Sequence, residues 1–179
     1  MLSRLIFSTS HLTTITIQIV CKMVKIDTVK LSLVGNGRVG KSTIRSMLEG
    51  TPNKNSPTIG VDIGKFSDDE LKCAVFDMGG QERFHMLWDD FMKGSSIVML
   101  VTDSTRDDVQ KARKIVQKLQ KSKNGAKLIA IANKQDEANK LNATQVEKIL
   151  KVKTYPMVAI QKARRSAMVN IIKENLSGD

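Results

Sequence analysis

One eight-residue pattern constrains this chain more than any other feature of its sequence. Gly35 and Gly40 enclose four residues and are followed by Lys41 and Ser42, which gives G-x-x-x-x-G-K-S. An apolar run precedes the pattern and an amphipathic stretch follows it, so the glycines lie where a strand becomes a helix. Backbone N–H groups at 37–42 and the positive end of the helix then favour a bound phosphate. A glycine-rich turn without a ligand is the alternative, which this context disfavours.

The pattern also assigns roles within this loop. Lys41 is expected to reach the outer phosphates of a nucleotide, and the Ser42 hydroxyl to ligate a magnesium ion. The residues expected to bind nucleotide here are Gly35, Asn36, Gly37, Arg38, Val39, Gly40, Lys41, Ser42 and Thr43.

Alternation of short apolar runs with amphipathic stretches predicts an α/β fold from Met23 onward. The 179 residues suffice for one domain with a proper core. Strands are expected at 29–34, 61–66, 71–76, 97–102, 128–132 and 157–160. Helices are expected at 41–49, 82–92, 106–122, 144–151 and 167–176. Together with the phosphate loop, these elements predict a P-loop NTPase with a mostly parallel six-stranded sheet flanked by about five helices.

The base of the nucleotide is predicted from a second motif, "NKQD" at 133–136, directly after an apolar run. Asp136 can accept two hydrogen bonds from the ring N–H and exocyclic amine of guanine, which adenine does not offer as a pair. Asn133 is expected to tie neighbouring loops together, and the stem of Lys134 to cover the base. Four such residues are also common in ordinary loops, so their place after a strand carries the prediction.

Two further segments lie between these motifs. "PTIG" at 57–60 presents Thr58, and "DMGGQERF" at 77–84 begins at the end of a predicted strand. Asp77 is suitably placed to hold magnesium through water, Gly80 to offer its N–H to a γ-phosphate, and Gln81 to orient an attacking water. Each segment alone could be a plain turn, whereas the ordered set is specific.

In this order, the four motifs resemble those of Ras-superfamily small GTPases over residues 29–176. The resemblance is greatest to the Arf and Arf-like branch, because of Gly-Gly-Gln after the aspartate, Trp88 and NKQD. "GQERF" and Gly-Arg-Val-Gly are closer to Rab or Ras proteins. The last guanine motif of the family, usually Ser-Ala-Lys, is replaced by Gln161, Lys162 and Ala163, so Gln161 and Lys162 are the base-contacting residues expected there.

The resemblance implies a molecular switch that binds GTP or GDP with Mg2+. Catalysis is expected from Gln81, Lys41 and Thr58, and magnesium binding from Ser42, Thr58 and Asp77. With GTP, Thr58 and Gly80 would hold their loops against the γ-phosphate, and hydrolysis would release them. Lys54 is the only cation between Gly50 and Thr58. The resemblance therefore implies slow turnover and a need for an activating protein. It also implies effectors and an exchange factor as partners.

Composition and charge bear on the partners. The chain has 29 Lys and Arg against 18 Asp and Glu, a net charge of +11, which favours a polyanionic partner. The basic stretch 106–127 contains no aromatic residues to stack bases, so no nucleic acid is expected. A solvated helix face is the first interpretation, and peripheral contact with an anionic membrane the second. Cys21 and Cys73 have no metal-binding or disulfide-like spacing, which suggests a reducing, cytoplasmic setting.

Three functions from different classes stay open: a hydrolysing GTPase switch, a scaffold that holds guanine nucleotide without cycling, and a basic nucleic-acid-binding protein. Residues 1–22 contain no acidic residue and fall outside the predicted domain, 23–179. They are interpreted as an extension upstream of a start at Met23, a targeting leader, or a membrane-contacting segment. Leu2 and Val24 exclude the glycine that N-myristoylation requires at either start.

Overall fold

Six strands form one mixed sheet in the computed structural model, which describes residues 28–53, 56–122 and 125–177. The strands are β1 (Thr28–Val34), β2 (Val61–Ser67), β3 (Lys72–Met78), β4 (Ile97–Thr102), β5 (Lys127–Ala132) and β6 (Thr154–Pro156). Their order is β2-β3-β1-β4-β5-β6. β2 runs antiparallel to β3, and the other neighbours are parallel. The predicted P-loop NTPase fold is therefore confirmed, while the expected leader 1–22 and the boundary at Met23 lie outside the described residues.

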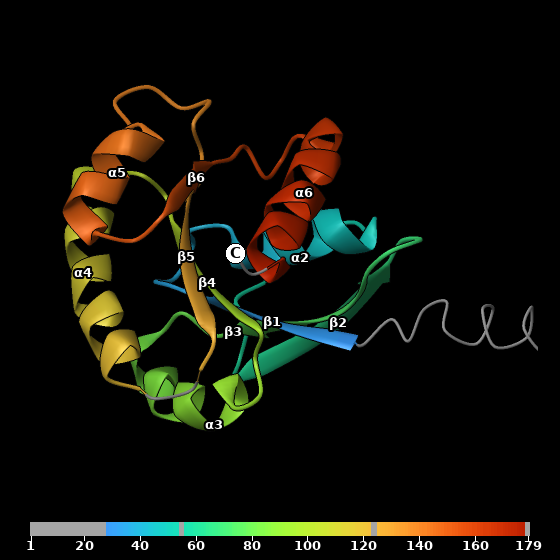
Figure 1. The fold of residues 1–179 in the computed structure, drawn as a ribbon. Coiled ribbons are helices and arrows are strands. Elements are labelled where there is room, and N and C mark those ends of the chain that lie inside the picture. The colour runs from blue at the N-terminus through green and yellow to red at the C-terminus, as the bar shows by residue number, and fades with distance from the viewer. Residues whose placement is uncertain (1–27, 54–55, 123–124, 178–179) are drawn as a thin grey trace, which may run out of the picture.

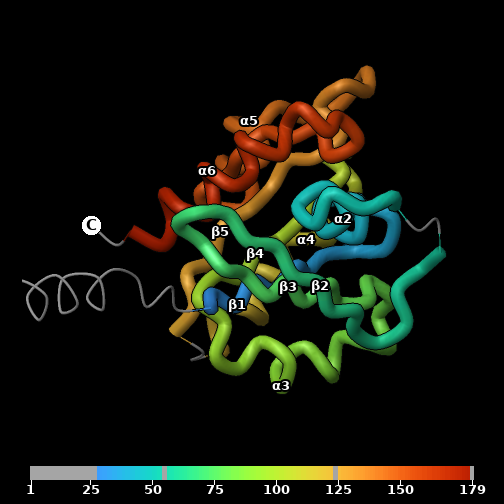
Figure 2. The backbone as a smooth tube through the Cα atoms, turned by 90° about the vertical axis from the view of Figure 1, so that its right-hand side faces the viewer, coloured from blue at the N-terminus to red at the C-terminus, as the bar shows by residue number. Residues whose placement is uncertain are grey.

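Helices cover both faces of this sheet (Figures 1 and 2). The described residues form five α-helices: α2 (Lys41–Glu49), α3 (Trp88–Met92), α4 (Arg106–Lys121), α5 (Ala143–Leu150) and α6 (Arg165–Leu176). Two 3-10 helices, η1 (Glu82–Leu87) and η2 (Lys162–Arg164), precede α3 and α6. α2 and α6 pack in one core cluster, and α3, α4 and α5 in the other.

Strand β4 shows how one sequence serves two cores. All six of its residues are buried, as expected for a parallel strand with helices on both faces. Ile97, Met99 and Val101 belong to the cluster beneath α2 and α6, whereas Val98 and Leu100 belong to the cluster beneath α3, α4 and α5. The continuous apolar run at 97–101 is therefore the signature of a central strand.

Two expected elements differ from the structure. The run 157–160 is not a strand, because the ladder with β5 uses Thr154, Tyr155 and Pro156 and is complete where β5 ends, at Ala132. The chain then turns, so that Ala159 is buried while Ile160 is 72% exposed. The helix expected at 82–92 is divided into the η1 turn and the short helix α3.

The sheet order places the nucleotide motifs together. β1 lies between β3 and β4, so the connection after β1 leads to β2 and β3 on one side of it, whereas the connection after β3 leads to β4 on the other side. Such a switch point is where open α/β sheets bind ligands.

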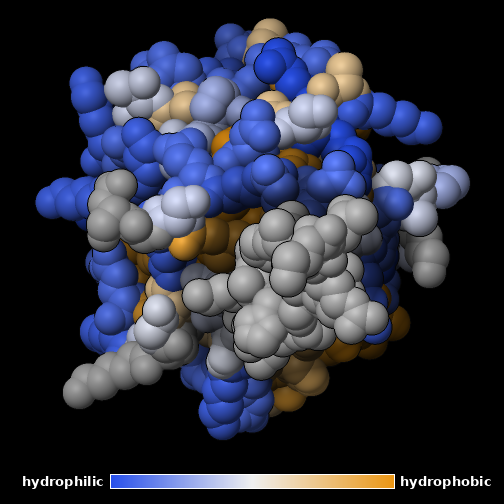
Figure 3. Space-filling model, turned by 45° about the vertical axis from the view of Figure 1, so that its right-hand side comes forward, coloured by the Kyte–Doolittle hydropathy of each residue, from blue (hydrophilic) through white to orange (hydrophobic). Residues whose placement is uncertain are grey.

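Hydrophilic residues cover most of the upper part of the face that Figure 3 shows. No helix among the described residues is long and apolar enough to cross a membrane.

Candidate functional site

The phosphate loop joins β1 to α2 and is shaped by its glycines. Gly40 is the residue before α2 and has φ of 104°, a left-handed conformation that side chains rarely adopt. A Cβ at Gly40 would also collide with the Asn133 side-chain amide. The loop therefore approaches the 133–136 segment at the point where a glycine is required.

Lys41 is the buried cation of this loop, with 6% of its surface exposed. Its Nζ donates to the carbonyl oxygens of Gly35 (3.0 Å) and Asn36 (2.7 Å). Burial lowers the pKa of Lys41 to about 8, although the negative charges of Asp77 and Asp108 oppose that shift. The amine thus lies within the loop against two backbone carbonyls, and an anionic ligand beside it would raise its pKa and favour its charged form.

Asp108 on α4 supports the same loop from outside, a contact that the sequence motifs did not indicate. Its Oδ1 accepts from Asn36 Nδ2 (2.7 Å), and its Oδ2 accepts from the Asp103 N–H (3.0 Å). Burial raises the pKa of Asp108, and its hydrogen bond with Asn36 opposes that shift. The carboxylate therefore fixes the residue whose carbonyl holds Lys41.

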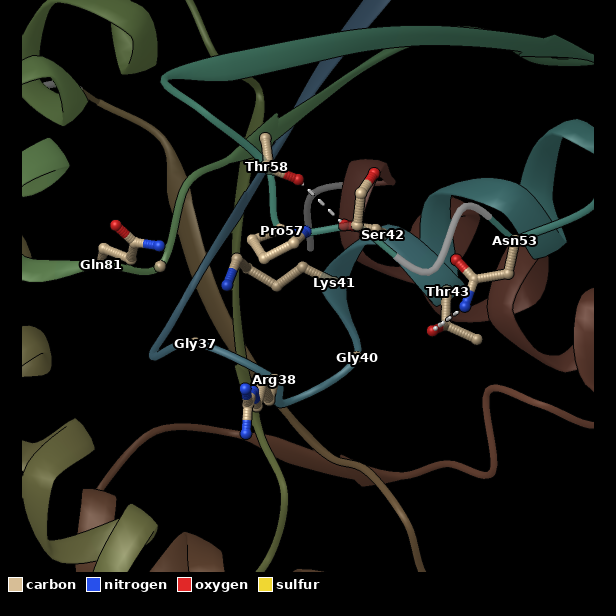
Figure 4. A pocket seen from close by; sticks show the side chains of 12 residues that line it. Gly37, Arg38, Gly40, Lys41, Ser42, Thr43, Asn53, Pro57, Thr58 and Gln81 are labelled. Carbon is tan, nitrogen blue, oxygen red and sulfur yellow. Dashed lines mark hydrogen bonds between the residues drawn. The ribbon is translucent and has the colours of Figure 1, made fainter.

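Ser42, Thr58 and Asp77, the three expected magnesium ligands, converge at one corner (Figure 4 shows the first two). Thr58 Oγ1 donates to Asp77 Oδ2 (3.2 Å) and lies 3.1 Å from Ser42 Oγ. Asp77 is fully buried at the end of β3. Burial raises the pKa of Asp77, while hydrogen bonds and the charges of Lys41 and Arg45 oppose that shift.

These residues fit a hydrated magnesium ion. Asp77 Oδ1 is buried and has no hydrogen-bond partner among the described residues. A buried carboxylate oxygen left without a partner is costly, and a metal-bound water would satisfy it. Hydroxyl and carboxylate oxygens are also the ligands that Mg2+ prefers.

The segment after β3 closes the site from the opposite side. A Cβ at Gly80 would lie 2.6 Å from Lys41 Nζ and would also meet the Asn36 carbonyl, so only glycine permits this approach. Trp88 is buried and donates from Nε1 to the Gly79 carbonyl (3.3 Å). Gln81 follows with an exposed side chain at the start of η1.

One cavity of about 540 Å³ gathers residues from the phosphate loop, from the 57–60 segment and from the 77–84 segment (Figure 4). In Figure 4, Arg38 projects to the side of the loop away from Thr58. Asn53, which the motifs did not predict, enters the lining and donates to Thr43 Oγ1 (3.1 Å). The lining residues are Gly37, Arg38, Gly40, Lys41, Ser42, Thr43, Asn53, Ser56, Pro57, Thr58, Gly80 and Gln81.

Asn133 links this cavity to the predicted base loop, as expected for a residue that ties loops together. Its Nδ2 donates to the Val39 carbonyl (2.9 Å), and its Oδ1 accepts from the Ala159 N–H (3.0 Å). Its own carbonyl accepts from Ser104 Oγ (2.6 Å). Three chain segments are therefore held around one buried residue.

The remaining predicted base-contacting residues do not line the cavity. Lys134 adopts φ of 62° and is partly buried, while Asp136 is exposed. Gln161 and Lys162 are exposed at the start of η2. The residue tied directly to Asn133 is instead Ala159, for which the sequence offered no signal beyond an apolar run.

Comparisons with known proteins identify relatives of this chain. A model of the ADP-ribosylation factor family matches residues 16–176. ADP-ribosylation factor J of Dictyostelium discoideum is 31% identical over 65% of this chain and 64% of its own length. ADP-ribosylation factor-like protein 1 of Saccharomyces cerevisiae is 32% identical over 68% of each chain. The chain thus spans slightly under two thirds of the first of these relatives.

The fold has a solved counterpart as well. The Arl6 BBS3 small GTPase of Trypanosoma brucei, solved with the nucleotide analogue GppNp, superposes with a TM-score of 0.73 at 20% identity. The superposition covers 84% of this chain and 98% of that one. At this identity, the similarity establishes the shared fold.

Proposed function

Because this chain belongs to the ADP-ribosylation factor family of small GTPases, we propose that it is a molecular switch that binds GTP and GDP with Mg2+ and hydrolyses GTP slowly. One observation carries the proposal: Lys41, Thr58, Gly80 and Gln81 border the same cavity. The GppNp bound to the Trypanosoma brucei protein supports the same ligand class.

The phosphate loop would bind the phosphates through its N–H groups and Lys41. Ser42, Thr58 and Asp77 would hold Mg2+, which when bound supplies positive charge against the phosphate oxygens. Because Thr58 already contacts both Ser42 and Asp77, its segment would be ordered by the occupied site and released after hydrolysis.

Gln81 would orient the attacking water, since its side chain is exposed at the cavity rim next to Gly80. Between Gly50 and Thr58 the only cation is Lys54, which lies outside the described residues. Without an arginine in that loop, turnover should be slow, at about 10⁻⁴ to 10⁻³ s⁻¹. An activating protein would then supply the missing charge, and an exchange factor would reload the switch.

Effector proteins would bind beside the cavity. Ile59, Ile63, Met86 and Leu87 are exposed large apolar side chains of the segments that flank it. Thr58 and Gly60 contact the Gly79 backbone region, so the two segments adjoin. A surface built on these segments would change with the bound nucleotide.

The chain would also contact an anionic membrane peripherally, from a cytoplasmic location at the membrane surface. The support for this contact is the exposed basic side chains of α4, among them Arg113, Lys114 and Lys121. We expect no nucleic-acid partner, because that helix has no aromatic residue.

A scaffold that holds nucleotide without cycling is the second candidate. It is favoured by the exposed Gln161 and Lys162, which replace the usual last guanine motif. Single-turnover hydrolysis of bound GTP separates the two candidates, because the scaffold would return GTP unchanged over the time in which the switch completes a turnover.

The base assignment is tested with Asp136→Asn. We expect GTP binding to weaken and xanthosine triphosphate binding to improve, because an amide can donate to the xanthine carbonyl that replaces the guanine amine. Equilibrium titration of both nucleotides, with Asn139→Asp as the matched exchange in the same loop, gives the comparison. An unchanged base preference would show that 133–136 is an ordinary loop.

A further inference from the structure

Arg45 lies beside the predicted metal site although it belongs to none of the nucleotide motifs. It projects from α2 one turn after Lys41, and its side chain is only 8% exposed. Its Nη2 lies 2.8 Å from Asp62 Oδ2, and its Nε lies 3.9 Å from Asp77 Oδ2. A buried guanidinium thus stands between the expected metal carboxylate and a second aspartate.

The two aspartates are brought together by the β2–β3 ladder. Asp62 and Asp77 are directly opposite each other in the antiparallel pairing. Side chains at opposite positions share a face of the sheet at close range, and like charges there destabilise the pair. Arg45 lies where it can neutralise that repulsion.

The contact of Arg45 with Asp77 differs from its contact with Asp62. Its Nε has no hydrogen-bond partner among the described residues, and neither has Asp77 Oδ1. At 3.9 Å the guanidinium acts on Asp77 through its charge, whereas the 2.8 Å contact with Asp62 is a close ion pair. Asp77 therefore keeps an oxygen for another ligand while a positive charge remains nearby.

A second contact anchors Arg45 to the edge strand. Glu49, one turn further along α2, lies 3.7 Å from Arg45 Nη1. Glu49 Oε1 also accepts the backbone N–H of Lys65 on β2 (3.2 Å). The position of the guanidinium is thereby fixed by both α2 and β2.

We propose that Arg45 is a positioning residue that sets the affinity of the site for its divalent cation. The inference rests on the proposed function, since it takes Asp77 as a ligand of the magnesium site. A positive charge this close to Asp77 opposes the binding of a second cation, and Asp62 reduces that opposition by neutralising Arg45. The balance between Arg45 and Asp62 therefore sets how much free Mg2+ the site requires.

Two variants that change the local charge in opposite directions test this inference. Arg45→Met keeps an unbranched apolar stem but removes the cation, so Mg2+ should bind more tightly. Asp62→Asn leaves Arg45 less neutralised, so Mg2+ should bind more weakly. The double variant restores the net charge and should return towards the parent.

The measured quantity is the free Mg2+ concentration at which dissociation of a fluorescent GDP analogue is half suppressed. We expect Arg45→Met to lower this midpoint and Asp62→Asn to raise it, each by at least about tenfold. Arg113→Met, which removes an exposed arginine of α4, is the matched control and should leave the midpoint near the parent value.

Shifts of the Mg2+ midpoint in opposite directions support the inference, because loss of packing alone would weaken Mg2+ binding in both variants. Parallel shifts, or midpoints equal to that of the parent, overturn it. If Arg45→Met does not fold, Arg45→Gln takes its place with the same expected direction: a midpoint below that of the parent supports the inference, and a midpoint equal to or above it overturns the inference. A parent chain that binds no guanine nucleotide would instead refute the proposed function.

Discussion

Replacing Asn133 by alanine should detach the base loop from the phosphate loop and destabilise the whole domain. The side-chain amide is buried and makes two hydrogen bonds, to the Val39 carbonyl and from the Ala159 N–H. Both partners belong to buried residues, so water cannot readily replace the lost amide. The change therefore leaves two buried backbone groups unsatisfied.

The magnitude follows from those two groups. Each unsatisfied buried group costs about 1–3 kcal/mol, so Asn133→Ala should lower the free energy of unfolding by about 2–6 kcal/mol. For a domain of this size each kcal/mol corresponds to roughly 2–4 °C. A decrease in melting temperature of about 4–24 °C is therefore expected.

Thermal and urea unfolding followed by circular dichroism measure this loss. Bound nucleotide adds to the stability of the folded state, so the comparison is made at several GDP concentrations and extrapolated to zero. Asn170→Ala, an exposed asparagine on α6, is the control. A loss within about 0.5 kcal/mol of that control would refute the reasoning, since surface substitutions commonly fall in that range.

Three further predictions concern the chemistry and the domain boundary. Burial holds the pKa of Lys41 at about 8, so the nucleotide-free protein loses the positive charge of Lys41 above that pH, whereas a bound phosphate favours the charged form. The affinity for GDP should therefore be constant below about pH 8 and fall above it, by up to about tenfold per pH unit. A GDP affinity that does not change up to about pH 9.5 would contradict a role for the charge of Lys41. Gln81→Leu should leave GTP bound but slow its single-turnover hydrolysis at least about tenfold, because water positioning is lost; a rate equal to that of the control Gln117→Leu would remove Gln81 from the mechanism. A chain beginning at Met23 should fold and bind guanine nucleotide as well as the full chain, as judged by circular dichroism and titration, and its failure to do so would place the domain boundary before Met23.

Much of the fold was predictable because its signals are local. The buried strand at 97–102 contains a continuous apolar run at 97–101, and the helix at 106–121 has apolar residues at helical spacing. The phosphate loop is equally local, since glycines, Lys41 and Ser42 lie within eight residues. Each of these segments carries its own evidence in the order of its residues.

The last strand was misplaced for a physical reason. The run 157–160 looks like a strand because it is apolar, but its burial comes from packing of the connection to η2. The pairing with β5 is made by Thr154, Tyr155 and Pro156 through their backbones, and backbone pairing leaves little trace in side-chain character. Only the position of β5 decided which residues of this stretch form the ladder.

The sequence by itself determined which chemical groups the site contains, because the four motifs name them in order. Tertiary structure alone decided which further groups surround them. Arg45, Asp62 and Asp77 are far apart along the chain and meet only when β2 pairs with β3 beneath α2. The Asp108 support of Asn36 likewise spans 72 positions. Such contacts depend on strand order and register, which no local pattern of residues encodes.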